Sequence, residues 1–454
     1  MNEMHLGEVV DADISFRCES EFFKKKIMLA KASIENCPTV SLLAEVAPDI
    51  QHPVEITRAY AESGCRMLLA QEVRCNQLVL GEGSYLDNPG AQFIKRNKLE
   101  VGDVVLTRTG ANFGQCAPVL FDDDLFACAD LLIIRKGAIS AGYLSTFLNT
   151  WQGRLLLDRG AYGAAQPHIA PTYLKNLPIP IFSNLIKPIS KLVERSAATR
   201  TKGLEALLKA EKYLLNALAL DNWKPPTPLS YVRSSNDAFT SGRLDSQFFA
   251  PRVSELMDRL GQDGLTIGDV APARHERFKS SDSGSFNYIE IGGLGSDGTA
   301  VAEALPQKEA PSRATQFVRA GDIITSTVRP IRRLSALIAE EQDGDVCSSG
   351  FVVLTPQKIS SEVLLTYLRL PLFCELMDLH TSATMYPAIS EADLLSLPIP
   401  AIDTKTQLAI QQSVQEAAVS RQRASNLLET AKRAVEIAIE DSEATAMAYL
   451  QGVV

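Results

Sequence analysis

The amino-acid sequence contains a long internal repeat. The motif Leu177-Pro178-Ile179-Pro180 returns as Leu397-Pro398-Ile399-Pro400, and Gly102-Asp103 returns as Gly321-Asp322 at almost the same displacement. Further matches, in the same order and at nearly constant displacement, are Cys128 with Cys347, Phe147-Leu148 with Tyr367-Leu368, Pro167-His168-Ile169 with Pro387-Ala388-Ile389, and Ser20-Glu21-Phe22-Phe23 with Ser246-Gln247-Phe248-Phe249. Because such a repeat is one structural unit used more than once, we expect a tandem duplication, with copies over roughly residues 1–220 and 240–450.

Each copy begins with a predicted globular part. Aliphatic and β-branched runs at residues 104–106 and 131–134 predict strands, and the runs at 323–324 and 351–354 repeat them. The Gly-Asp pair ahead of the first run is typical of a tight turn, because glycine tolerates positive φ and aspartate bonds the backbone that follows it. Two short helices are expected to cover these strands, around residues 143–151 and 363–370.

Each copy ends in a long predicted helix. Apolar or small residues step by four and three along residues 189–217 and again along 410–438, which is the heptad pattern of a coiled coil. The seams are rich in alanine and glycine, so two helices could approach closely. Arg200 and Arg421 interrupt the seams at equivalent places. Each either extends past the seam to solvent or fixes the register of the helices.

This order of elements predicts an α+β fold, in which a mixed α/β globular domain and a long helix occur twice. Thr404 and Gln407 predict a capping box at the start of the second helix. The expected segments are a first globular domain at 1–182, a first helix at 183–220, a stiff proline-rich connector at 221–240, a second globular domain at 241–401, a second helix at 402–445 and a tail at 446–454.

Charge and cysteine content narrow the class of protein. The net charge is −9, which is not the composition of a protein that grips nucleic acid over its whole surface, although local basic loops remain compatible with it. The eight cysteines include no Cys-x-x-Cys pair. There is also no signal-peptide pattern and no apolar run of about 18 residues. These features predict a protein of the reducing cytoplasm.

Several paired motifs resemble those of one known family. They are the Gly-Asp strand, the Leu-Pro-Ile-Pro element before each long helix, and the openings Arg17-Cys18-Glu19 and Arg243-Leu244-Asp245. With Pro400 followed by Gln407, they resemble the specificity (S) subunit of type I restriction–modification enzymes over nearly the whole chain. The first copy departs from that pattern, because Ile186 stands where the second copy has Gln407.

The resemblance implies a non-catalytic, DNA-binding recognition subunit of an anti-phage defence system. The globular domains would be two target-recognition domains, each reading half of a split double-stranded DNA sequence, and the two helices would form an antiparallel coiled coil. The implied partners are two methyltransferase (modification) subunits and, in the restricting complex, translocase–nuclease subunits. No membrane association is implied.

The sequence lacks the motifs of the chemistry that such complexes perform. It has no Asp/Asn-Pro-Pro-aromatic motif to hold a flipped adenine and no glycine-rich phosphate loop ending in Lys-Ser/Thr. Its five histidines include no pair at metal-ligand spacing. We therefore expect no intrinsic enzymatic activity, no cofactor and no metal ion.

Candidate DNA contacts are cationic, amide and aromatic side chains in loops, because such groups bond phosphates and base edges. In the first copy they are Lys95, Arg96, Lys98, Arg108, Asn112, Gln115, Gln166 and His168. In the second copy they are Arg274, Arg277, Lys279, Arg329, Arg332, Arg333 and Tyr386. Basic runs are often only solvated surface, and the segments around His168 and Tyr386 also suit ordinary turns. Repetition at equivalent places favours a DNA role, most of all for residues 329–333.

Two other functions remain compatible with the sequence. One is a duplicated coiled-coil scaffold whose globular units bind proteins. The other is a recognition subunit of a different methyltransferase-based defence system. A steep loss of DNA binding with rising salt would distinguish DNA recognition from a protein scaffold.

Overall fold

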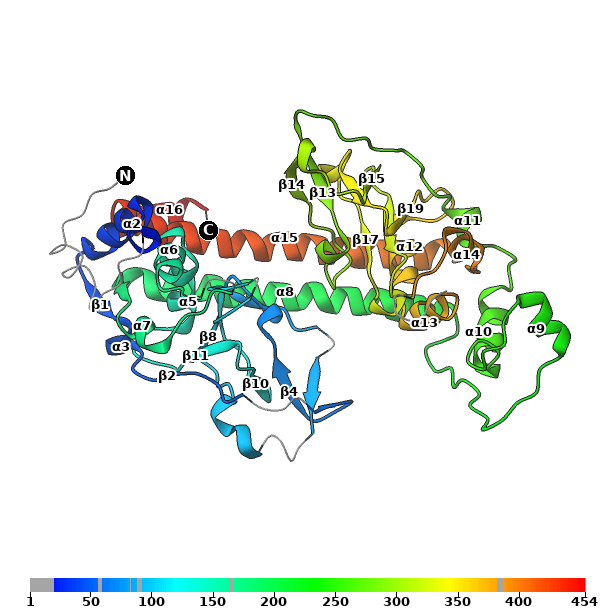
Figure 1. Ribbon diagram of the computed structural model, residues 1–454, viewed down its shortest axis with the longest axis horizontal. Coiled ribbons are helices and arrows are strands. Elements are labelled where there is room, and N and C mark those ends of the chain that lie inside the picture. Colours follow the sequence, from blue (N-terminus) through cyan, green and yellow to red (C-terminus); the bar gives the residue numbers. More distant parts are fainter. Residues whose placement is uncertain are drawn as a thin grey trace. The chain divides into compact units, whose positions relative to one another are not determined.

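The structure of the chain is a computed structural model that describes residues 20–55, 59–81, 83–87, 92–110, 112–163, 166–381 and 387–453. It divides into unit 1, comprising Met1–Thr201 and Ser420–Val454, and unit 2, comprising Lys202–Val419. Each unit contains sheets and separate helices, so the fold class is α+β, as predicted. The two long helices, α8 (Ser183–Ala217) and α15 (Thr404–Glu440), each have residues in both units (Figure 1).

Unit 1 is built on two four-stranded sheets, of strand order β2-β11-β8-β9 and β10-β4-β7-β3, with the short pairs β1-β12 and β5-β6. Its strands are β1 (Val40–Leu42), β2 (Ile50–Gln51), β3 (Tyr60–Ala61), β4 (Cys65–Leu68), β5 (Val73–Arg74), β6 (Gln77–Leu78), β7 (Ser84–Leu86), β8 (Val104–Thr107), β9 (Cys116–Pro118), β10 (Leu125–Ala127), β11 (Leu131–Ile134) and β12 (Pro178–Pro180). Its shorter helices are α2 (Lys25–Glu35), α3 (Leu43–Val46), α5 (Ala141–Asn149), α6 (Trp151–Arg159), α7 (Pro171–Lys175) and α16 (Glu443–Val453).

Unit 2 repeats this plan with a four-stranded sheet of order β14-β13-β18-β15 and a three-stranded sheet of order β17-β16-β19. Its strands are β13 (Ser285–Ile289), β14 (Glu303–Pro306), β15 (Ala314–Phe317), β16 (Ile323–Ser326), β17 (Ser335–Leu337), β18 (Val346–Ser348) and β19 (Phe351–Leu354). Its shorter helices are α9 (Ser235–Ser241), α10 (Pro251–Leu260), α11 (Ile267–Val270), α12 (Ser361–Leu368), α13 (Pro371–Leu379) and α14 (Glu391–Ser396).

The four predicted strands form one antiparallel pair in each unit. In unit 1 β8 and β11 are antiparallel with Leu131 opposite Thr107, and in unit 2 β16 and β19 are antiparallel with Phe351 opposite Ser326. Every residue of the four strands is buried. Side chains alternate between two hydrophobic clusters, one on each face of the sheet. Because both faces of these strands are covered, the strands are continuous apolar runs. A strand with one face in solvent would instead alternate apolar and polar residues.

The Gly-Asp motif turns the chain into each central strand. Gly102 and Gly321 have φ of +98° and +84°, as the motif predicts. The aspartate bonds the backbone three residues before it, on the opposite side from the one expected. Asp103 accepts from the Glu100 N–H and Asp322 accepts from the Arg319 N–H, both at 2.9 Å.

Each of the two short helices expected over the strands is a pair of helices. In unit 1 α5 ends at Asn149 and α6 starts at Trp151, and the Thr150 hydroxyl between them accepts from the Gly153 N–H at 3.1 Å. In unit 2 Pro371 opens α13, which suits a position where no N–H is needed. The break places Asn149, the last residue of α5, and Arg369, the residue that follows α12, close to the strands.

The two long helices pack along the predicted seam. In unit 1 the early part of α8 meets the late part of α15, which brings together Ile189, Val193, Ala431 and Val435. In unit 2 the late part of α8 meets the early part of α15, which brings together Ala210, Leu214, Ile410 and Val414. Within each unit the helices are therefore antiparallel (Figure 1). The Ser196 hydroxyl donates to the Ala424 carbonyl at 2.7 Å, a contact that needs the close approach that small seam residues permit.

Arg200 and Arg421, the two interruptions of the seam, lie in different surroundings. Arg200 does not extend into solvent: its Nη1 donates to the Leu78 carbonyl at 3.0 Å and to Gln77 Oε1 at 3.2 Å. It thereby holds the β5-β6 hairpin on α8. Arg421 is exposed. The two arginines therefore differ in burial, although they stand at equivalent places in the heptad pattern.

The cap of the second long helix is one residue earlier than the capping box predicts. Asp403 accepts from the Thr406 N–H at 3.0 Å and from the Thr406 hydroxyl at 2.6 Å, while Gln407 donates to the Ile402 carbonyl. The hydrogen bond from the Thr406 side chain lowers the pKa of Asp403. Aspartate at the N-cap satisfies backbone donors that the first helical turn leaves unpaired.

The opening motif of the second copy has a structural role. Arg243 donates to Asp245 at 2.7 Å and to the Leu379 carbonyl at the end of α13, and its guanidinium lies 4.4 Å from the centre of the Phe248 ring. These contacts attach the segment that follows the connector to the end of helix α13. The equivalent Arg17 and Glu19 lie outside the described residues.

Within the described residues, no helix is long and apolar enough to cross a membrane. The seven cysteines of that part of the chain are all free thiols.

Candidate nucleic-acid interface

An eight-residue turn, which we call the first turn (residues 108–115), joins β8 to β9 in unit 1. The Thr107 N–H donates to the Gln115 carbonyl, and the Gly114 N–H donates to the Thr107 carbonyl, both at 2.8 Å. Gly110 and Gly114 have φ of +90° and +71°, so the turn uses two left-handed positions that favour glycine. Three of the candidate DNA contacts of the first copy, Arg108, Asn112 and Gln115, lie in this turn.

Unit 2 contains a similar turn at residues 327–334, which we call the second turn. The Ser326 N–H donates to the Leu334 carbonyl at 2.8 Å, matching the contact that closes the first turn. The Arg332 N–H donates to the Arg329 carbonyl at 3.0 Å, as the Phe113 N–H does to Gly110. The two left-handed positions are also kept, although arginines occupy them: Arg329 has φ of +52° and Arg333 of +59°.

The second pair of candidate segments lies beside these turns. In unit 1 Thr109 forms an isolated β-bridge with His168, and in unit 2 Val328 forms one with Ala388. The Arg329 N–H also donates to the Pro387 carbonyl at 2.8 Å. The structure therefore brings together, within each unit, two segments that the sequence marked separately. Tyr386 lies outside the described residues.

Two anchors that the sequence analysis missed hold the far side of the turns. Asn149 Nδ2 donates to the Cys116 carbonyl at 2.7 Å. Arg369, at the equivalent place in the second copy, donates from Nη1 to the Arg333 and Ser335 carbonyls at 2.7 and 3.1 Å. The sequence does contain a signal for these anchors. It is a polar residue at the end of a buried apolar helix, at the same place in both copies.

Arg333 is engaged within unit 2. Its guanidinium forms an ion pair with Glu211 of α8 and donates through Nε to the Arg369 carbonyl at 2.7 Å. Burial lowers the pKa of the neighbouring Arg369, and the charge of Arg333 lowers it further. Arg333 therefore fixes the second turn on the helices, and we do not retain it as a candidate base contact.

Arg274 is engaged in a similar way. Its Nε and Nη2 donate to the two oxygens of the buried Asp322 at 2.7 and 3.0 Å. These hydrogen bonds raise the pKa of Arg274. In unit 1 the equivalent Asp103 is paired with Arg135 at 2.6 Å. Arg274 thus supports the Gly-Asp turn, and we do not retain it as a DNA contact either.

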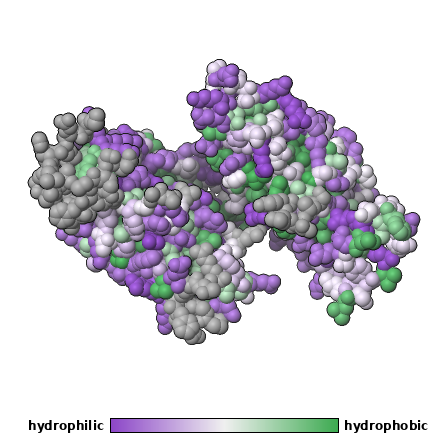
Figure 2. Space-filling model, viewed as in Figure 1, coloured by the Kyte–Doolittle hydropathy of each residue, from purple (hydrophilic) through white to green (hydrophobic). Residues whose placement is uncertain are grey.

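The other candidates remain at the surface. In unit 1 Lys95, Arg96 and Gln166 are exposed, Arg108 is half-buried, and Lys98 pairs with Asp124 at 2.7 Å in an exposed ion pair. In unit 2 Arg277 and Lys279 are exposed next to β15, and Arg332 is exposed at the second turn. Figure 2 shows hydrophilic side chains at the outer edge of the part of unit 2 that holds β13, β14 and β15. A cationic and amide surface of this kind suits phosphate and base contacts.

Buried polar atoms gather beneath the first turn. Thr107 Oγ1, Thr109 Oγ1, His168 Nδ1 and Arg154 Nη1 are buried without a hydrogen-bond partner among the described residues. The other guanidinium nitrogen, Arg154 Nη2, donates to the Phe113 carbonyl at 2.7 Å. The Nδ1 atom of His168 is thus shielded from solvent, although the side chain as a whole is half-buried, like those of Arg108, Asn112 and Gln115.

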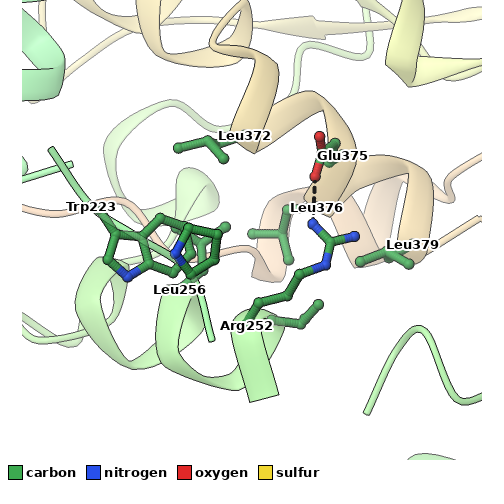
Figure 3. A pocket seen from close by; sticks show the side chains of 9 residues that line it. Trp223, Arg252, Leu256, Leu372, Glu375, Leu376 and Leu379 are labelled. Atoms are coloured by element: carbon green, nitrogen blue, oxygen red, sulfur yellow. Dashed lines mark hydrogen bonds and ion pairs between the residues drawn. The ribbon is translucent and has the colours of Figure 1, made fainter. Parts of the chain in front are cut away.

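A pocket in unit 2 offers no comparable chemistry (Figure 3). It is lined by Trp223, Pro225, Arg252, Val253, Leu256, Leu372, Glu375, Leu376 and Leu379. The charged pair in this lining, Arg252 and Glu375, is 2.8 Å apart, and Trp223 donates from Nε1 to Glu255 at 2.9 Å. This lining contains no nucleophile beside a base, and we interpret the pocket as the joint between the connector and helices α10 and α13. Among the described residues, no group of three or more His, Cys, Asp or Glu side chains could hold a metal ion.

A scan against models of protein families and a search of curated proteins find no match. Solved structures with similarity include the S subunit of a type I restriction–modification system from M. genitalium, at 14% identity and a TM-score of 0.37, covering 91% of this chain and 96% of that one. The HsdS subunit from Thermoanaerobacter tengcongensis is 15% identical with a TM-score of 0.27, covering 89% and 97%. A structure described for complex assembly and conformational transition of the type I R-M system is 16% identical with a TM-score of 0.27, covering 90% and 98%. At these scores the similarity carries no argument, and the assignment of function rests on the residues described above.

Proposed function

We propose that the chain is the DNA sequence-recognition subunit of a type I restriction–modification complex, with the two turns and their flanking segments as its DNA-contacting surfaces. The observation that carries the proposal is that a turn of the same length, with the same closing hydrogen bond and the same two left-handed positions, occurs in both copies with different side chains. Gly110, Asn112 and Phe113 in the first turn correspond to Arg329, Ile331 and Arg332 in the second, all three at one common displacement along the chain.

Different side chains on one backbone are the arrangement that a reader of two unlike half-sites needs. The support on the far side of the turns keeps a common function, because Asn149 bonds the Cys116 carbonyl and Arg369 bonds the Arg333 and Ser335 carbonyls. Side chains presented by the turns differ in character between the copies, as at Asn112 and Ile331. Base identity in the major groove is read by such outward amide, cationic and apolar groups.

The charge of the chain fits a contact restricted to these surfaces. With 45 Lys and Arg against 54 Asp and Glu, most of the protein would repel DNA. Arg96, Arg108, Arg277 and Arg332 would supply local attraction, and the partner subunits would supply the remaining phosphate contacts. In this proposal the target is bipartite, and two methyltransferase subunits and the translocase–nuclease subunits assemble on the chain.

The test uses the full chain, purified through a C-terminal tag from its own host with the subunits that remain bound. The probe is a pool of duplex DNA with a random central segment. We expect enrichment of two short blocks separated by an unread gap, and a steep fall of affinity with salt. No enriched sequence at low salt, or capture of proteins without any DNA preference, would favour the scaffold alternative.

A further inference from the structure

The second turn presents an apolar side chain to solvent beside a cation. Ile331 is 48% exposed, and the Arg332 side chain is exposed with no hydrogen bond or ion pair to the described chain. A single exposed apolar side chain is ordinary on a protein surface, so the case for Ile331 rests on its fixed backbone and on its counterpart in the first turn.

The backbone on both sides of Ile331 is fixed. Pro330 is buried, the Arg329 N–H bonds the Pro387 carbonyl, and the Arg333 side chain is held by Glu211 and the Arg369 carbonyl. Two non-glycine residues in the left-handed region are strained positions that persist only where surrounding contacts enforce them. Ile331 is therefore presented in one defined position.

The first turn carries Asn112 at the equivalent place. The intervening hydrogen bonds match, because Phe113 bonds Gly110 as Arg332 bonds Arg329. Among the described residues, the Asn112 side chain makes only long contacts, donating to the Ala70 carbonyl at 3.5 Å and accepting from Gln115 Nε2 at 3.4 Å. Both are near the limit of a hydrogen bond, so the amide can exchange them for better partners.

We propose that this position reads one base pair in each half-site: Asn112 bonds the adenine edge, and Ile331 contacts the methyl group of thymine. The inference rests on the proposed function. Asparagine matches the N6 donor and N7 acceptor of adenine in the major groove, and an aliphatic side chain matches the thymine 5-methyl group. Arg333 and Glu211 act as positioning residues for the second turn.

Ile331→Asn tests the assignment directly, because it gives the second turn the side chain of the first. An exposed side chain of normal φ tolerates the change, which unchanged thermal unfolding would verify. In the selection from random duplex DNA, one base pair of one block should change from a thymine to an adenine preference, by roughly tenfold. All other positions of both blocks should be unchanged.

Val232→Asn is the matched control, since Val232 is 95% exposed in the same unit but lies in the connector. It should leave the enriched sequence unchanged. If the wild-type chain enriches no sequence, the proposed function fails. If the wild type enriches a bipartite sequence and Ile331→Asn enriches the same one, the reading role of Ile331 is refuted alone. Loss of one whole block without any altered preference would also refute it, because it would point to a wedge between bases instead of a methyl contact.

Discussion

Gly110 and Arg329 occupy the same position in the two turns, one in each copy, and both have a left-handed backbone. Glycine adopts this conformation without strain, whereas an L-residue with a side chain is disfavoured by roughly 1–2 kcal/mol. The second copy nevertheless carries arginines, Arg329 and Arg333, at the two positions where the first copy has glycines. Keeping a strained backbone is consistent with selection for what the second turn presents at its tip.

The two glycines of the first turn should differ in their tolerance of alanine. A Cβ at Gly110 would meet no atom within 4 Å, while a Cβ at Gly114 would lie 2.6 Å from Arg154 Nη1. Gly110→Ala should cost only the backbone strain, about 1 kcal/mol. Gly114→Ala should cost about 2–3 kcal/mol, because Arg154 must also give up its bond to Phe113. Denaturant unfolding of the two variants measures the difference, and equal costs would contradict the account.

The ion pair between Arg333 and Glu211 should contribute measurably to stability. Their side chains are 24% and 22% exposed, so solvent screens the pair only in part. A double-mutant cycle with Arg333→Ala and Glu211→Ala should give a coupling free energy of about 1 kcal/mol. The exposed pair of Lys98 and Asp124 is the control, with an expected coupling below about 0.5 kcal/mol. Similar couplings for the two pairs would show that Arg333 is held no more firmly than a surface cation.

The duplication, the central strands and the helix seams could be predicted because short-range patterns encode them. A buried strand is an apolar run, and a helix seam is a spacing of four and three, wherever the chain places them. The Gly-Asp turn could be located for the same reason. The direction of the aspartate hydrogen bond could not, since backbone donors are available on both sides of it.

The roles of individual arginines could not be predicted, because they depend on distant partners. Arg333 stands in the most basic run of the second copy, yet Glu211 lies 122 residues before it. Arg274 is likewise committed to Asp322, 48 residues later. Asn149 and Arg369 went unnoticed since neither belongs to a basic loop. Their hydrogen bonds to the turns depend on where the helix ends lie in three dimensions, which the sequence does not specify.

The N-cap of α15 should give a pH-dependent contribution to stability. The folded-state pKa of Asp403 is lowered by its bond from Thr406, so the contribution is present above the unfolded pKa of about 3.9 and is lost as pH falls through the folded value. Asp403→Ala should lower the melting temperature at pH 7 and make less difference as the pH falls below 4. Asp403→Asn keeps a capping oxygen that does not titrate. A constant gap between Asp403→Ala and the wild type from pH 7 to pH 2 would show that the carboxylate is not the cap.

The two copies neutralise the same buried carboxylate from different strands. Asp103 is bonded by Arg135, just after β11, and Gln51 of β2 accepts from the same guanidinium at 3.1 Å. Asp322 is bonded by Arg274 from the segment paired with β19, and Thr355, just after β19, donates to it at 2.9 Å. Because Ile50 pairs with Ile134 as Ala273 pairs with Leu354, Arg274 corresponds to Gln51 and Thr355 to Arg135.

The cation that neutralises Asp103 should therefore also be effective at residue 51, the position that corresponds to Arg274 in unit 2. Arg135→Thr should destabilise unit 1 by about 2–4 kcal/mol, because it leaves the buried carboxylate of Asp103 without its cation. Adding Gln51→Arg should recover at least half of that loss, since an arginine there has the geometry of Arg274. Gln51→Arg alone is the control for a general effect of added charge and should change stability little. Denaturant unfolding of the three variants measures each step, and a double variant no more stable than Arg135→Thr would show that the two copies hold their Gly-Asp turns by unrelated means.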